Sequence, residues 1–303
     1  MMKRYIVLIM ALLISFNSCE KDRTTLRLAT YTYASNDRIE NLQPLAKVLE
    51  ELTQKPVKTI SYPDVASFID GIKMNEVDIA LINTLGYLLL SLDNEHMRPA
   101  MALKVREDAK DNYKTVLLTN NSDIASLEDL REKVHDLSML FVAEGSTSGN
   151  LVPRLLLSSL GIKSPEDRFK EVGYGGNHTS TLEKLVRGNA DVCAIGSNEY
   201  FKQVEADSSI RSSARLLWIS DEIPLGPVLL NKKLGREIQA RITEALVSLH
   251  HTNSPALSSL KAGWSEAKQA DRFYPVTDKD YDNFRNVNGN KTDLAEILAL
   301  FTK

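Results

Sequence analysis

The segment Gly145-Ser146-Thr147-Ser148-Gly149 places three hydroxyl side chains in a row between two glycines. Glycine allows a backbone to approach a ligand closely. Pro153 follows, and because proline is tolerated only in the first turn of a helix, a helix should begin just after the hydroxyls. Backbone N–H groups and the positive end of the dipole at a helix N-terminus attract anions. The segment therefore predicts an anion site, although an ordinary Ser/Thr helix cap without a ligand would use the same residue types.

Four other residues could reach the same ligand. His178 lies at a predicted strand-to-helix junction, and an imidazole beside an oxyanion is expected to hold a proton and strengthen the hydrogen bond. Asn83 and Thr84 follow a buried strand and precede a helix, and Tyr33 follows the first strand. A solvent-facing loop histidine and a tyrosine packed at the rim are the alternatives at these positions.

The chain alternates between strand and helix patterns, which would place these residues at the ends of strands. The first series predicts strands over 26–31, 57–62 and 77–82, with helices opened by Pro44 and Asp64 and another over 85–92. The second series predicts strands over 113–118, 138–142, 169–174, 191–195 and 214–219, and helices over 126–133, 151–160, 179–187 and 198–205. Helices over 234–249 and 294–301 follow. Strands separated by helices favour parallel sheets covered on both faces, with ligands bound at the carboxyl ends of the strands.

The first residues predict export. Lys3 and Arg4 precede an apolar run from Tyr5 to Ile14, which is about half the length needed to span a bilayer and is typical of a signal peptide. The sequence Ser15-Phe16-Asn17-Ser18-Cys19 then resembles the lipobox of bacterial lipoproteins, in which the cysteine carries lipid. Ordinary secretion with an incidental cysteine is the alternative. Lipidation of Cys19 would leave Cys193 without a partner, and Cys193 lies in an apolar stretch typical of a buried, inert thiol.

The composition limits the class of function. There are 37 basic and 40 acidic side chains, with a formal net charge of −3. This balance argues against a nucleic-acid partner, which would require a basic surplus. No sequence spacing typical of a metal, dinucleotide or Walker site occurs, so no cofactor is predicted.

Several segments together resemble the phosphate-, phosphite- and phosphonate-binding proteins of ABC importers. They are Gly145-Ser146-Thr147-Ser148-Gly149 with the Leu151-Val152-Pro153 that follows, Gly175-Gly176-Asn177-His178, residues 75–80, residues 188–192 and Ile223-Pro224-Leu225-Gly226-Pro227. The resemblance covers about residues 26 to 285. It implies a periplasmic, lipid-anchored solute-binding monomer with two Rossmann-like α/β lobes, of the type II periplasmic binding protein kind, that works with an ABC permease. It also implies that Ser146, Thr147, Ser148 and His178 hold the phosphorus oxygens, with Gly149 beside them. The positions of Asn83, Thr84 and Tyr33 after strands of the first lobe predict that they complete the site.

Under this interpretation the chain divides into a signal peptide (1–18), a lipidated linker (19–25), a first lobe (26–116 plus 223–303) and a second lobe (117–222). Some positions depart from the family pattern. Val65 and Ile82 stand where aromatic residues are common, and Asn198, beside Glu199, stands where a carboxylate pairs with the ammonium of aminoalkyl ligands. Phosphate, phosphite or a small alkylphosphonate is therefore favoured over 2-aminoethylphosphonate.

Two other functions use the same residues. A two-lobed protein can present its closed form to a membrane signalling partner instead of a permease, and the sequence does not separate these roles. A hydrolase with Ser146, His178 and Asp191 is less favoured, because threonine occupies the centre of the Gly-x-Ser-x-Gly pattern. The sequence therefore predicts a binding protein and not an enzyme.

Overall fold

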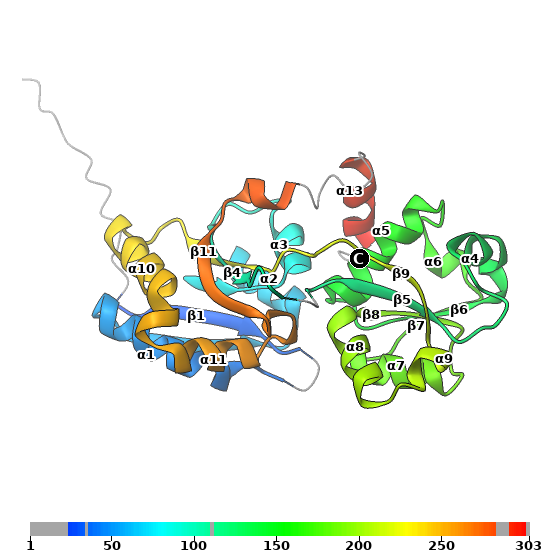
Figure 1. Ribbon diagram of the computed structural model, residues 1–303. Coiled ribbons are helices and arrows are strands. Elements are labelled where there is room, and N and C mark those ends of the chain that lie inside the picture. The colour runs from blue at the N-terminus through cyan, green and yellow to red at the C-terminus, as the bar shows by residue number, and fades with distance from the viewer. Residues whose placement is uncertain (1–23, 34–35, 110–111, 283–290, 301–303) are drawn as a thin grey trace, which may run out of the picture.

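The computed structural model describes residues 24–33, 36–109, 112–282 and 291–300. The predicted signal peptide and Cys19 lie outside the described residues. The chain forms two mixed α/β halves that lie side by side, each built on its own sheet (Figure 1). This is the two-lobed α/β architecture predicted from the sequence.

The first sheet has six strands in the order β11-β4-β10-β3-β1-β2. Its strands are β1 (Leu26–Tyr31), β2 (Val57–Tyr62), β3 (Ile79–Leu81), β4 (Met97–Val105), β10 (Pro227–Asn231) and β11 (Ala270–Pro275). The helices of this half are α1 (Ile39–Thr53), α2 (Val65–Lys73), α3 (Thr84–Leu90), α10 (Arg236–Thr252) and α11 (Ser254–Ala262). Strands β1, β2 and β3 are parallel as predicted, whereas β4, β10 and β11 pair antiparallel.

The second sheet has five strands in the order β7-β6-β8-β5-β9. Its strands are β5 (Thr115–Thr119), β6 (Ser138–Phe141), β7 (Glu171–Tyr174), β8 (Val192–Gly196) and β9 (Arg215–Ile219). Its helices are α4 (Leu127–Lys133), α5 (Val152–Ser159), α6 (Pro165–Arg168), α7 (His178–Val186), α8 (Ser197–Ala206) and α9 (Ile210–Ser213). Strands β6, β7 and β8 are parallel, while β5 runs antiparallel to both β8 and β9. Both sheets are therefore mixed, each with a parallel core of three strands.

Three helical starts test the local predictions. Asp64 caps α2 by accepting from the N–H of Ser67 at 2.7 Å, and Ser126 caps α4 by accepting from Asp129, both as expected. Pro44 was predicted to open its helix, and this was wrong, because α1 begins at Ile39 and contains the proline. Proline removes the hydrogen bond to the carbonyl four residues earlier, and that carbonyl belongs to Glu40 in the first turn, where the helix tolerates the loss.

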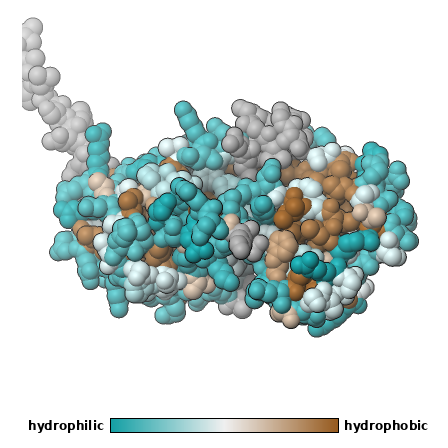
Figure 2. All heavy atoms as spheres, viewed as in Figure 1, coloured by the Kyte–Doolittle hydropathy of each residue, from teal (hydrophilic) through white to brown (hydrophobic). Residues whose placement is uncertain are grey.

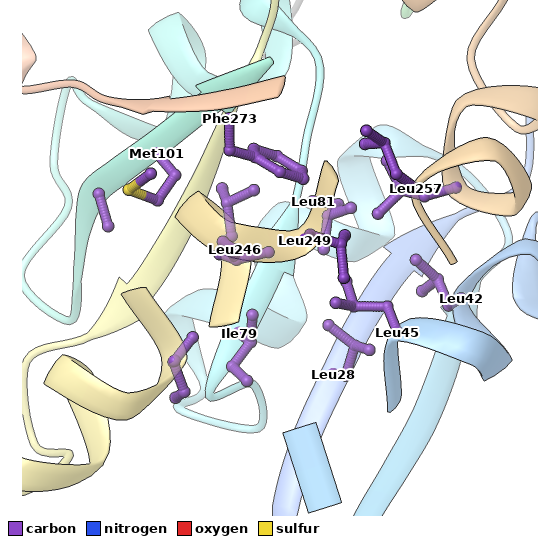
Figure 3. Close-up of a cluster of buried hydrophobic side chains, with 14 of the residues drawn as sticks. Leu28, Leu42, Leu45, Ile79, Leu81, Met101, Leu246, Leu249, Leu257 and Phe273 are labelled. Atoms are coloured by element: carbon purple, nitrogen blue, oxygen red, sulfur yellow. The ribbon is translucent and has the colours of Figure 1, made fainter. Parts of the chain in front are cut away.

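The largest core lies between the first sheet and helices α1, α10 and α11. Figure 3 shows how leucines from these helices converge on the strands, including Leu42, Leu246 and Leu257. The opposite face of the sheet packs against α2 and α3. Burial of these apolar side chains is the main term that holds the strands in place, and therefore fixes the loops at their ends.

The final helix connects the two halves. Helix α13 (Lys291–Leu300) packs against α5, and its buried Leu294, Ile297 and Leu298 belong to the same cluster as Leu151 and Leu155. Figure 1 shows α13 above α5, on the side of the second sheet. Apolar residues spaced three and four apart give the helix one face for this contact.

Apolar side chains also reach the surface of the second half. Figure 2 shows them gathered on its front face, whereas the same face of the first half is mostly hydrophilic. Leu216 and Ile219 of the edge strand β9 are among the exposed large apolar residues. In the part of the chain that the structure describes, no helix combines the length and apolar character needed to cross a bilayer.

Candidate functional site

The hydroxyl segment connects β6 to α5 through one turn of π-helix. The π-helix covers Thr147–Leu151, so that the N–H of Val152 bonds the carbonyl of Thr147, and α5 follows with Pro153 in its first turn. Ser146 caps the turn by accepting from the N–H of Gly149 at 3.0 Å. A Cβ on Gly149 would lie 2.3 Å from Cγ2 of Val142, so only glycine fits there. The predicted helix start near residue 151 is confirmed, and wide turns of this kind are often found at functional sites.

Two of the predicted site residues hold the segment against the first half. The hydroxyl of Thr147 accepts from the N–H of Leu85 at 3.0 Å. The amide of Asn83 donates to the carbonyl of Gly145 at 2.8 Å, while its oxygen caps α3 by accepting from Gly86. Both side chains also line the small cavity described below. They therefore join the two halves of the chain at the edge of that cavity.

Thr84 lies differently from its predicted partners. Its hydroxyl donates to the carbonyl of Pro224, and the side chain is buried. It does not line either of the two cavities that contain His178. In this arrangement Thr84 holds the segment before β10 against α3.

His178 is held by the end of β8 as a neutral imidazole. The N–H of Gly196 donates to Nδ1 at 2.9 Å, so Nδ1 carries no proton and the ring's single proton lies on Nε2. Burial of the ring lowers its pKa from 6.5 to about 4, and the negative charge of Glu199 opposes this shift only partly. The expectation that His178 holds a second proton was therefore wrong. It offers a neutral Nε2–H donor, and this atom lies 3.3 Å from the hydroxyl of Tyr33.

The two glycines before His178 each have a steric reason. A Cβ on Gly175 would lie 1.9 Å from Oγ1 of Thr181 in the first turn of α7, and Gly176 has a φ of +98°. Asn177 then caps α7 in a capping box with Ser180. This turn places the imidazole at the helix start, next to the end of β8.

Ser148 carries a buried hydroxyl. Its side chain is 0% exposed, and within the described residues its Oγ makes no hydrogen bond. The hydroxyl of Tyr113 lies near it, because burial raises the pKa of Tyr113 and the side chain of Ser148 opposes this rise. A Cβ on Gly196 would lie 3.3 Å from this Oγ and 3.5 Å from Cε1 of His178, so both side chains border the same glycine. Ser148 itself lines neither of the two cavities that contain His178. Because a buried hydroxyl without a partner costs about 1–3 kcal/mol, a hydrogen bond from this hydroxyl to a ligand would relieve that cost.

A small cavity of about 20 Å³ brings most of the site residues together. Its lining comes from the carboxyl ends of β1 and β3, from the hydroxyl segment, from α7 and from the turn after α11. The lining residues are Tyr31, Tyr33, Arg38, Asn83, Tyr113, Ser146, Thr147, His178, Ser265 and Glu266. A wider cleft shares Tyr33, His178 and Glu266 with it and continues past Asn198. The inner cavity has room for about one water-sized group in this structure, and the cleft beside it is much larger.

Sequence reasoning missed two charged residues of this cavity, Arg38 and Glu266. Arg38 stands directly after Asn36 and Asp37, both of which are more usual helix-capping types, so no local pattern marked it. Glu266 follows α11 in a short 3₁₀ turn (Ser265–Ala267), far from every predicted motif. Both residues reach the cavity only through tertiary packing.

The arrangement does not support the hydrolase alternative. A catalytic triad needs the imidazole Nδ1–H to donate to a carboxylate, whereas Nδ1 of His178 accepts from a backbone N–H. Asp191 instead accepts from the N–H and the hydroxyl of Ser138 at 2.9 and 2.7 Å. Within the described residues no cluster suitable for a metal ion occurs, and Cys193 is a buried thiol whose pKa is raised by burial.

The positions that depart from the family pattern are buried, hydrogen-bonded or part of the wider cleft. Val65 and Ile82 are buried, and their side chains would lie within 3 Å of a Cβ on Gly86. Glu199 accepts from the hydroxyl of Thr179 at 2.8 Å and from Gln203 at 2.6 Å. Asn198 lines the wider cleft with a buried oxygen that has no partner among the described residues.

Comparison with known proteins defines the class. A family model described as "ABC transporter, phosphonate, periplasmic substrate-binding protein" matches residues 28–281. The chain therefore belongs to this family of substrate-binding proteins, whose members are not enzymes.

Individual relatives agree with this assignment. A phosphate-import protein of Mycolicibacterium smegmatis is 25% identical over 84% of this chain and 81% of its own length. The phosphonates-binding periplasmic protein of Escherichia coli is 25% identical over 86% of this chain and 77% of its own. The structure of PhnD1 from Prochlorococcus marinus in complex with methylphosphonate has a TM-score of 0.66 at 18% identity, and it covers 88% of this chain and 97% of that one. At this identity the structural match shows the shared fold.

Proposed function

We propose that this chain is the solute-binding component of an ABC importer and that it binds a small phosphorus oxyanion in the cavity between its two lobes. The oxyanion would accept hydrogen bonds from Ser146, Ser148 and Tyr33 and from the Nε2–H of His178. The N–H of Gly149, predicted to join them, donates to Ser146 instead. Thr147 and Asn83 would hold the two lobes together around it.

The observation that carries this proposal is the convergence of Ser146, Tyr33 and the neutral imidazole of His178 on one cavity. The buried hydroxyl of Ser148 lies next to Gly196, as this imidazole does. Neutral donors around a helix N-terminus suit a protein that must both hold and release an anion. The names of the relatives point to the same chemistry, since they refer to phosphate, phosphonates, phosphite and methylphosphonate.

Location and partners form part of the same proposal. Residues 1–18 would direct export, and Cys19 would carry the lipid that anchors the protein in the periplasm beside its permease. Residues 26–116 with 223–303 would form one lobe and 117–222 the other, with α13 as a strap from the first lobe onto α5 of the second. The protein would act as a monomer and would need no cofactor.

A thermal-shift panel tests the proposed ligand class. The panel contains phosphate, phosphite, methylphosphonate, 2-aminoethylphosphonate and sulfate, each added to the mature protein in large excess. A ligand present at a hundred times its Kd should add about 2.7 kcal/mol to the free energy of unfolding, a rise in Tm of about 5 °C or more. We expect at least one of the first three to give this rise and sulfate to give none. A panel without a shift from any phosphorus compound would contradict the proposed function.

A further inference from the structure

Arg38 is a buried arginine that faces the cavity. It precedes α1 with a φ of +59°, a left-handed conformation that is uncommon for a residue other than glycine. Its side chain is only 3% exposed. The guanidinium carbon lies 4.5 Å from the ring centre of Trp264, 4.9 Å from that of Tyr31 and 5.3 Å from that of Tyr33. Three aromatic rings therefore hold the planar group in one place.

The hydrogen-bonding capacity of Arg38 is only partly used. Its Nε donates to the carbonyl of Gly263 at 2.8 Å, which fixes the base of the guanidinium. Its Nη1 is buried and makes no hydrogen bond within the described residues, and neither does the hydroxyl of Tyr31. The two groups are close, because burial raises the pKa of Tyr31 and the Arg38 side chain opposes this rise. Both residues line the cavity that contains Ser146 and His178. A buried guanidinium N–H without an acceptor is costly, so the fold maintains a donor that an anion would satisfy.

The charges that line the cavity also favour a role for Arg38 in binding an anion. Glu266 lines the same cavity, and in the described part of the chain no ion pair joins it to Arg38 or to another cation. Burial raises the pKa of Tyr33, and the negative charge of Glu266 raises it further. His178 and the serine hydroxyls carry no charge. Arg38 is therefore the one cationic side chain among the described residues that line the cavity. Its charge offsets that of Glu266, which would otherwise repel an anion.

We propose that Arg38 is a direct ligand-binding residue whose free Nη1 donates to the oxyanion from the first lobe, opposite the neutral donors of the second. This deepens the proposed function and rests on it. A contact between Arg38 and the ligand also predicts which charge state of the ligand is preferred. A doubly ionised phosphorus oxyanion should bind more tightly than its singly ionised form, because the one cation of the cavity touches it.

Calorimetry on three forms of the protein tests this assignment with phosphate and methylphosphonate as probes. Arg38→Met should weaken the binding of whichever probe the wild type prefers by at least a hundredfold, and Arg38→Lys by about tenfold, because lysine keeps the charge but cannot hold Gly263 and the oxyanion together. In the wild type the affinity should rise as the pH passes the second ionisation of the probe, and in Arg38→Met this rise should be absent. His178 stays neutral throughout this pH range, so the rise reports the charge of the ligand.

Arg27→Lys is the matched control. Arg27 lies on β1 of the same lobe and pairs with the buried Asp78 at 2.9 Å, away from the cavity, so its replacement should lower stability and leave the affinity within about twofold. Affinity for the probe within about threefold of wild type in both Arg38 variants would overturn the role of Arg38 while leaving the proposed function intact. A wild type that binds neither probe would overturn both.

Discussion

Ser148→Ala should weaken the binding of the phosphorus oxyanion by about ten- to a hundredfold and leave the stability of the free protein unchanged or slightly higher. The loss in affinity follows from the 1.5–3 kcal/mol that a hydrogen bond to a charged group typically contributes. Stability should not fall, because the hydroxyl of Ser148 is buried and makes no hydrogen bond among the described residues. Calorimetry gives the affinity, and denaturant unfolding without ligand gives the stability.

Ser138→Ala is the matched control for this prediction. Ser138 begins β6, the strand that leads into the hydroxyl segment, and its Oγ donates to Asp191 at 2.7 Å. Removing a hydroxyl that donates to a carboxylate should lower the free energy of unfolding by about 1.5–3 kcal/mol and leave the affinity unchanged. The two variants should therefore show opposite effects. Wild-type affinity in Ser148→Ala would remove this hydroxyl from the site.

The stability of the ligand-free protein should fall by roughly 3 kcal/mol between pH 6.5 and pH 4 because of His178 alone. The pKa of this imidazole is lowered to about 4 in the folded protein, from 6.5. Between these values the unfolded chain binds a proton that the folded protein excludes, so acid favours unfolding. The stability from this group is complete above pH 6.5 and is lost as the pH falls towards 4. Urea unfolding at several pH values measures this slope.

Variants isolate the contribution of His178 from the carboxylates that titrate nearby. In His178→Gln the slope between pH 6.5 and 4 should be smaller by the amount that His178 contributes, since glutamine can accept from Gly196 without titrating. His135→Gln changes an exposed histidine of the same lobe and should keep the wild-type slope. A slope in His178→Gln equal to that of the wild type would contradict the neutral, buried imidazole.

Helices and strands could be predicted from the sequence where residues that are close together along the chain determine them. Asp64 and Ser126 cap their helices through hydrogen bonds three residues along, which the sequence shows directly. Strands β10 and β11 could not be assigned in the same way, because they pair antiparallel with β4, a partner distant in the sequence. Their pairing depends on which strand edge is free once the parallel core has formed.

The site residues also divide into those that a local sequence pattern indicates and those that only tertiary packing brings to the site. The glycines around Ser146 and before His178 mark sharp turns, so the sequence could indicate where loops and helix starts lie. It could not indicate that Thr147 and Asn83 bond across to the other half of the chain, or that Gly196 fixes the tautomer of His178. Arg38 and Glu266 were missed for the same reason, because they meet the hydroxyl segment only after both halves are folded.

The central claim is that a phosphorus oxyanion occupies the cavity at the hydroxyl segment. The most direct test is a crystal structure of the mature protein grown with the compound that gives the largest thermal shift. The account predicts phosphorus density in this cavity, with ligand oxygens within hydrogen-bond distance of Ser148 Oγ, His178 Nε2 and Arg38 Nη1. Density at another place, or a ligand held in the wider cleft without contact to Ser148 and His178, would contradict it.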